Sequence, residues 1–246
     1  GDETIDYLRD RFGLDESARV LDLGCGAGQL AVPLATHVGE MVGMDPNEEM
    51  LRHARRLAEE VGVENSRWLV GSDADLVTHA DDFDPLRLTT MGRSFHWMDQ
   101  PRTLDRLFEL TEPGGGVALL TDREWLTKGT DAWQAGVYDL ATEYVGDIPD
   151  RVDPETAEYD DPWDELLFDH GFVDVETTTF PVRREWDVDS VVGYVFSLSF
   201  CSPATLGEER EAFEATLREY LHGRDAEQFV QHTEIEIISG RTEPRS

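Results

Sequence analysis

The chain has 246 residues, of which 39% are hydrophobic, 53 are acidic and 21 are basic, giving a formal net charge of −32 at pH 7. This length and apolar content suffice for one sizeable core, so we predict a single domain over residues 1–246, with insertions at about 123–170 and 186–205. No apolar run approaches the roughly 18 residues of a membrane span and no leader pattern opens the chain, so we expect a cytoplasmic protein without a membrane partner.

The acidic excess is accompanied by a nearly complete absence of lysine: Lys128 is the single lysine against 20 arginines. A surface of one sign repels itself in dilute salt and is screened in concentrated salt. We therefore expect adaptation to a salty, halophilic cytoplasm, the alternative being an acidic surface that matches a basic partner.

Metal chemistry has no support in the sequence. Cys25 and Cys201 are too few for a disulfide framework or a metal knuckle, and there is no HExxH motif or close His/Cys cluster. We predict no metal site.

Apolar runs and helical spacing alternate along the first half of the chain. Short apolar runs predict strands at 19–23, 40–44, 67–71, 87–91 and 116–121. Helices are predicted over 27–38 and from the cap residue Asn47 to Gly62. Strands alternating with helices predict a parallel, doubly wound α/β sheet.

The pattern changes after Asp122. Apolar spacing predicts helices over 133–144, 187–198 and 208–221, and an acidic loop runs to Trp163. Long strands are predicted at 172–184 and 229–238. These two strands lack a clean crossover, so we expect a hairpin-like pair at one edge of the sheet.

The stretch VLDLGCGAGQLAVPLA, residues 20–35, places glycines at alternate positions after a carboxylate. A phosphate-binding turn has the different spacing GxGxxG, and the charge of Asp22 would repel a phosphate but suits an ammonium group. Asp45 ends the second predicted strand, where a carboxylate can accept hydrogen bonds from both hydroxyls of a ribose. A ribose and an amino acid without phosphate describe S-adenosylmethionine.

Four segments in order carry a resemblance to class I S-adenosylmethionine-dependent methyltransferases, in their small-molecule branch with a methyltransferase type 11-like core: VLDLGCGAGQLA, VGMDPNEEML, GSDADL and MGRSFHWMD. The resemblance covers about half the chain, roughly 19–121. It implies a Rossmann-like seven-stranded, mostly parallel sheet with an antiparallel last strand and a helical cap. It also implies that the turn from Asp22 to Gly28 meets the methionine, Asp45 the ribose, and Asp73 with Ala74 the adenine.

We accordingly expect the cofactor to be bound by residues at four strand ends: Asp22, Gly24, Cys25, Gly26, Gly28, Asp45, Pro46, Met50, Ser72, Asp73, Ala74, Ser94 and Phe95. The alternative is that the glycines only make a tight turn. Asp75 is a rival of Asp73 in the same loop. The resembling enzymes have an N-terminal helical segment that closes over the cofactor, whereas only residues 1–14 precede the first predicted strand.

Candidate catalytic and substrate residues are fewer. His96 follows the fourth strand and is a candidate general base, the alternative being a histidine that packs beside Trp97. Aromatic residues are predicted to line the substrate pocket: Trp97, Trp125, Trp133 and Tyr194.

The function predicted from the sequence is methyl transfer from S-adenosylmethionine to a small organic acceptor. A cofactor-binding protein of the same fold without turnover is the alternative, and an NAD-dependent oxidoreductase is a third, weaker one. Nucleic acid is disfavoured as a partner because the fourth-strand motif is RSFHW, not Asn/Asp-Pro-Pro-aromatic, and no basic stripe exists. The acceptor and the oligomeric state do not follow from the sequence.

Overall fold

A computed structural model describes residues 2–83, 85–122, 131–146, 162–224 and 228–244. The chain divides into two compact units. The first unit comprises 1–121, 161–180 and 236–246, and the second comprises 122–160 and 181–235. The second unit overlaps both expected insertions, and the single domain stays a prediction. Each unit is described by itself.

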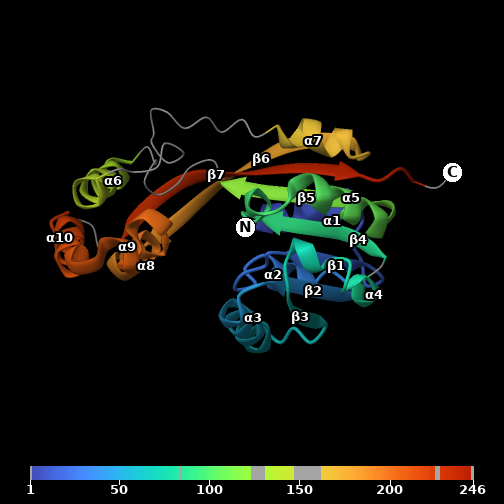
Figure 1. Cartoon of the computed structure of the whole chain (residues 1–246), viewed down its shortest axis with the longest axis horizontal. Helices are drawn as coiled ribbons and strands as arrows, with labels where there is room; N and C mark the ends of the chain where they lie inside the picture. The colour runs from blue at the N-terminus through green and yellow to red at the C-terminus, as the bar shows by residue number, and fades with distance from the viewer. Residues whose placement is uncertain (1, 84, 123–130, 147–161, 225–227, 245–246) are drawn as a thin grey trace. The chain divides into compact units, whose positions relative to one another are not determined.

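One seven-stranded sheet has the order β3-β2-β1-β4-β5-β7-β6 (Figure 1). Its parallel part consists of β1 (Arg19–Leu23), β2 (Glu40–Asp45), β3 (Ser66–Val70), β4 (Leu86–Gly92) and β5 (Thr111–Asp122). The strand β7 (Phe229–Arg241) lies between β5 and β6 (Val173–Trp186), and antiparallel pairing at this edge makes the sheet mixed. The predicted fold class and the pairing of the last two strands are confirmed.

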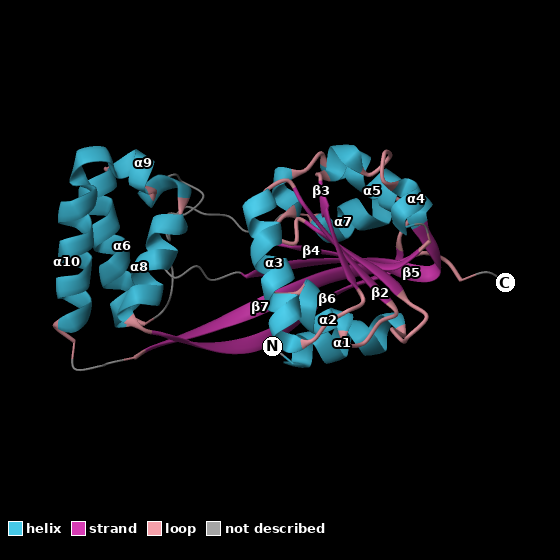
Figure 2. Cartoon of the chain, turned by 90° about the horizontal axis from the view of Figure 1, so that it is seen from below, coloured by secondary structure: helices cyan, strands magenta, loops and turns pink. Residues whose placement is uncertain are grey.

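Helices cover both faces of the sheet in the first unit, as Figure 2 shows. One face carries α1 (Asp2–Phe12), α2 (Ala31–Ala35) and α3 (Glu48–Val61), and the other carries α4 (Ala80–Phe83), α5 (Gln100–Leu110) and α7 (Trp163–Asp169). The main apolar core joins the second group of helices to the strands: Leu104 and Leu107 of α5 pack with Leu167 of α7. Two 3-10 turns follow strand ends, η1 (Asp73–Asp75) and η2 (Phe95–Trp97).

The helix boundaries follow their capping residues. Asn47 caps α3 by accepting the backbone N–H of Glu49, and Gly62 ends it in the left-handed conformation, as the sequence predicts. The helix expected over 27–38 is wrong in extent, because only Ala31–Ala35 is helical. The preceding residues form the glycine turn instead.

The segment before β1 is a sheet-packed helix. The hydroxyl of Tyr7 in α1 donates to Glu176 over 2.7 Å and lies 3.1 Å from the hydroxyl of Ser239. Arg11 pairs with Glu176 at 2.9 Å. These contacts bind α1 to β6 and β7, so its described residues belong to the body of the first unit.

The second unit is mainly helical. Its helices are α6 (Ala132–Val145), α8 (Val188–Ser197), α9 (Pro203–Leu206) and α10 (Arg210–His222), with the 3-10 turns η5 (Ser199–Cys201) and η6 (Gly207–Glu209). Its core is built from aromatic and branched side chains, including Trp133, Val195 and Phe213. Within the described part of the chain, no helix is both long enough and apolar enough to cross a bilayer.

Candidate functional site

The turn between β1 and α2 requires its glycines. Gly24, Gly26 and Gly28 have positive φ values of 75°, 52° and 79°, which side chains rarely adopt. A Cβ on Gly24 would lie 2.4 Å from the Cβ of Ser94, whereas a Cβ on Gly26 would meet no atom within 4 Å. The turn is therefore packed against the segment after β4 at Gly24 and open at Gly26.

Asp45 joins this turn to the end of β2. The carboxylate is 9% exposed and accepts the backbone N–H groups of Gly26 and Asn47, each over 2.8 Å. Both oxygens are thus oriented by the backbone. Pro46 follows Asp45 and is exposed, and Met50 in the first turn of α3 is 39% exposed.

Asp22 lies beneath the turn. Its side chain is 2% exposed, and the hydroxyl of Thr90 on β4 donates to it over 2.8 Å. Burial raises the pKa of Asp22 to about 7; the Thr90 hydrogen bond lowers it, and the charge of Asp45 raises it. Sequence reasoning missed Thr90, because a threonine within a buried strand carries no motif.

Cys25 is a buried residue of the glycine turn. Its side chain is buried, and burial followed by the charges of Asp22 and Asp45 holds the pKa of the thiol well above its usual range. The thiol therefore stays protonated at neutral pH, which suits packing and not nucleophilic chemistry.

The turn after β3 separates the roles of its two aspartates. Ser72 caps η1 by accepting the N–H of Ala74, and Asp75 accepts the N–H of Ser72 over 2.9 Å. Asp73 instead accepts the N–H of Asp99 over 3.1 Å. Asp75 is thus used within its own turn, and Asp73 reaches Asp99, the N-cap of α5.

The segment after β4 divides between core and surface. The hydroxyl of Ser94 donates to the carbonyl of Leu23 over 2.6 Å, and Phe95 is buried edge-on against Trp163 at 5.5 Å between ring centroids. His96 and Trp97 are exposed, with ring centroids 4.9 Å apart and Trp97 71% exposed. Phe95 therefore serves the core, and His96 and Trp97 face outward beside the strand ends.

The remaining predicted pocket residues lie elsewhere. Trp125 is outside the described residues. Trp133 is buried in the second unit and donates its indole N–H to the carbonyl of Val230 over 2.9 Å. Tyr194 packs on Trp186 in the same unit, 5.3 Å between ring centroids.

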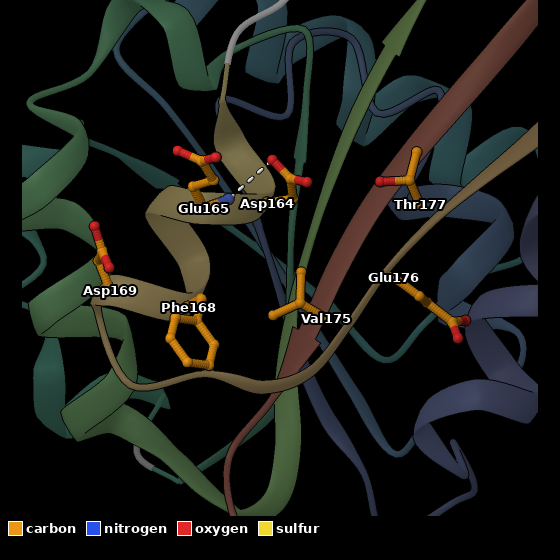
Figure 3. A pocket seen from close by; sticks show the side chains of 7 residues that line it. All are labelled: Asp164, Glu165, Phe168, Asp169, Val175, Glu176 and Thr177. Carbon is orange, nitrogen blue, oxygen red and sulfur yellow. Dashed lines mark hydrogen bonds between the residues drawn. The ribbon is translucent and has the colours of Figure 1, made fainter.

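A separate pocket of about 410 Å³ lies between α7 and β6 in the first unit. Figure 3 shows its acidic lining. The lining residues are Asp164, Glu165, Phe168, Asp169, Val175, Glu176 and Thr177. None of them is a predicted site residue, and β6 is at the opposite edge of the sheet from β3. Over the described residues there is no group of three His, Cys, Asp or Glu side chains placed to hold a metal ion.

Comparison with known proteins agrees with this geometry. Residues 20–115 match a family model described as a methyltransferase domain. An uncharacterized methyltransferase-like protein of Schizosaccharomyces pombe is 26% identical over 216 residues, covering 87% of this chain and 77% of its own. A ubiquinone biosynthesis O-methyltransferase of Azoarcus sp. is 31% identical over 117 residues, covering 48% of this chain and 49% of its own.

Among solved structures, a putative type II methyltransferase from Anaeromyxobacter dehalogenans superposes with a TM-score of 0.67 at 21% identity, covering 98% of this chain and 97% of its own. That likeness extends the fold beyond the segment matched by the family model. With the glycine turn and Asp45 at adjacent strand ends, these findings support a class I S-adenosylmethionine-dependent methyltransferase.

Proposed function

We propose that this protein binds S-adenosylmethionine at the carboxyl ends of β1 to β4 and transfers its methyl group to a small organic acceptor. The observation that carries the proposal is the hydrogen bond from the Gly26 N–H to Asp45. This hydrogen bond fixes the Asp45 carboxylate, which suits a ribose, beside the open glycine turn, which suits the methionine.

Each part of the site has an assigned partner in this proposal. The remaining lone pairs of Asp45 accept the ribose hydroxyls. The methionine lies over the open backbone at Gly26, with Asp22 beneath the turn to favour its ammonium group. Pro46, Met50 and Ala74 offer exposed surface for the adenine.

The cofactor, held by the glycine turn and Asp45, would supply an activated methyl group on its sulfonium to a lone pair of the acceptor. The chain orients the two partners, excludes water and, for an acceptor that must lose a proton, provides a base. We assign that role to His96, whose exposed ring follows the end of β4, and assign Trp97 to the wall beside it.

The small-molecule class of acceptor is supported by the O-methyltransferase relative, which matches 48% of this chain. We place acceptor specificity in residues outside the matched range 20–115, with Trp133 and Tyr194 as candidates.

Calorimetry in molar potassium chloride tests the cofactor assignment. We expect S-adenosylhomocysteine to bind and NAD not to bind. Asp45→Ala should weaken binding by at least about 1–3 kcal/mol, because ribose and backbone donors lose their acceptor. Glu49→Ala, which removes a neighbouring exposed carboxylate, is the control and should bind normally. NAD binding without a response to the methionine cofactor would end the proposal.

His96→Ala separates an enzyme from a binder. If His96 is the base, methyl transfer should fall by a factor on the order of 100 to 10,000 while cofactor affinity stays unchanged. A small loss, or one that follows a loss of cofactor affinity, assigns His96 to packing. Tight cofactor binding without transfer to any small acid, phenol or amine in a broad panel would favour a non-catalytic binder.

We also infer a halophilic, cytoplasmic setting from the net charge of −32. Screening shortens from about 10 Å at 0.1 M salt to about 3 Å at 1 M, which relieves self-repulsion of the compact state. The melting temperature should rise from dilute to molar potassium chloride, and a flat or falling curve would contradict the inference.

A further inference from the structure

We propose that the start of α5 positions Asp73, through the backbone N–H of Asp99 and the hydroxyl of Thr103, so that the site selects the amino-bearing base adenine over its deaminated counterpart. The inference rests on the proposed function, because it takes Asp73 as the residue that meets the base. It adds two groups, the backbone N–H of Asp99 and the hydroxyl of Thr103, that are not among the predicted site residues.

Two donors converge on one oxygen of the Asp73 carboxylate. The N–H of Asp99 donates to Oδ2 over 3.1 Å, and the hydroxyl of Thr103 lies within hydrogen-bond distance of the same oxygen at 3.4 Å. Thr103 is 2% exposed on an 11-residue helix, so its hydroxyl cannot turn to water. The carboxylate is thereby oriented from the helix side.

The helix start also favours the negative charge of Asp73. Asp99 is the N-cap of α5 and accepts the N–H of Arg102, which fixes the backbone whose own N–H points at Asp73. The positive end of the helix dipole is at this position. Asp73 is therefore held as a rigid acceptor.

The other carboxylate oxygen, Oδ1, accepts no hydrogen bond within the described part of the chain. An ionised carboxylate only accepts, so this oxygen can pair with the amino group of adenine but not with the carbonyl that replaces it in hypoxanthine. A site that leaves a polar group unpaired discriminates strongly against the analogue that lacks the matching group. Free rotation of Asp73 would weaken that discrimination.

The experiment compares the affinities of the full chain for S-adenosylhomocysteine and for its deaminated analogue, S-inosylhomocysteine, by calorimetry in molar potassium chloride. We expect wild type to prefer the adenine compound by at least about tenfold. Thr103→Val keeps the shape and removes the hydroxyl, and should reduce that preference by about three- to tenfold. Thr103→Ser restores a hydroxyl and should recover the preference.

Thr89→Val is the matched control, since Thr89 is also buried but its hydroxyl has no hydrogen-bond partner among the described residues. It should leave the preference unchanged. A wild-type preference that survives Thr103→Val intact, in a variant with normal melting, overturns the role of Thr103.

A second pair of variants tests the N–H of Asp99 even if Thr103→Val does not fold. The φ of Asp99 is −72° and Met98 is extended, so proline fits at 99 and removes only the donor and the cap. Asp99→Ala removes the cap but keeps the N–H. The base preference should fall in Asp99→Pro relative to Asp99→Ala, and equal preferences would overturn the inference.

If the proposed function itself is wrong, wild type should bind neither S-adenosylhomocysteine nor S-inosylhomocysteine. Equal binding of both compounds by wild type keeps the cofactor site but overturns the selective role of Asp73.

Discussion

The two units differ in what fixes their structure. In the first unit, β1 and β2 are buried at every position but the first, and the Asp45 carboxylate at the end of β2 accepts the N–H of Gly26 in the turn after β1. In the second unit, buried side chains of α6, α8 and α10 pack into an aromatic and branched core. The family match at 20–115 lies within the first unit.

The two units also differ in how strongly their structure restricts the choice of residues. A turn that depends on positive φ and close backbone approach admits few residues, so it keeps a readable pattern. A helical core accepts many apolar combinations of similar volume, so it leaves no motif. The following predictions test that contrast, beginning with the largest effect.

Gly24→Ala should cost about 2–5 kcal/mol of unfolding free energy, because strain at positive φ adds to a clash with Ser94. Cofactor binding should be lost with it. Gly26→Ala is the control: it has the strain without the clash and should cost about 1–2 kcal/mol. Urea unfolding of both variants measures the difference, and equal costs would mean that close packing at Gly24 does not matter.

Asp22→Asn should remove a pH dependence of stability. Asp22 has a folded pKa of about 7 against an ordinary value of 3.8. Between these values the folded chain keeps a proton that the unfolded chain has lost, so the unfolding free energy falls as pH rises. From pH 5 to pH 8, wild type should lose about 2–3 kcal/mol relative to the variant.

Urea unfolding of wild type and Asp22→Asn at both pH values measures this difference. If the unfolding free energies of wild type and Asp22→Asn change equally between the two pH values, Asp22 is not the group that keeps a proton in the folded chain. The variant should also bind S-adenosylhomocysteine more weakly, since the neutral amide no longer favours an ammonium group.

Gly136→Ala should disturb only the second unit. A Cβ at this position of α6 would lie 1.8 Å from the hydroxyl of Tyr220, which is held by the carbonyl of Ala132. The expected cost is about 1–3 kcal/mol, with cofactor affinity unchanged. Gly193→Ala in α8 meets open space and should instead stabilise by up to about 1 kcal/mol. Thermal melting measures the stability of both variants, and calorimetry measures their cofactor affinity. A change in cofactor affinity with either variant would contradict the expectation that the second unit does not affect the cofactor site.

Thr90→Val and Thr89→Val compare adjacent buried hydroxyls of β4. Thr90 donates to Asp22, so its loss should cost about 1–2 kcal/mol. Within the part of the chain that the structure describes, the buried hydroxyl of Thr89 has no hydrogen-bond partner, so its replacement should be neutral or stabilise by about 1 kcal/mol. Equal effects in denaturant unfolding would argue that the bond to Asp22 contributes nothing.

The sequence predicted β1 to β4 closely, because parallel strands buried in a sheet appear as short apolar runs between glycines and caps. It missed the first part of β5, which begins at Thr111 and not at the predicted residue 116. It missed most of the short elements: α4 and α7 have four and seven residues, too few for a periodic signal. It also missed α5, an 11-residue helix, although the N-cap Asp99 is a helix-start signal in the sequence.

By itself the sequence determined the class of fold, the glycine turn and the carboxylates at the strand ends, because positive-φ positions and buried strands restrict residue choice locally. Tertiary structure alone decided which groups those carboxylates meet. Thr90 reaches Asp22 across 68 positions of the chain, and Thr103 reaches Asp73 across 30. Such contacts arise when strand order and helix packing bring distant residues together, and no spacing along the chain encodes them.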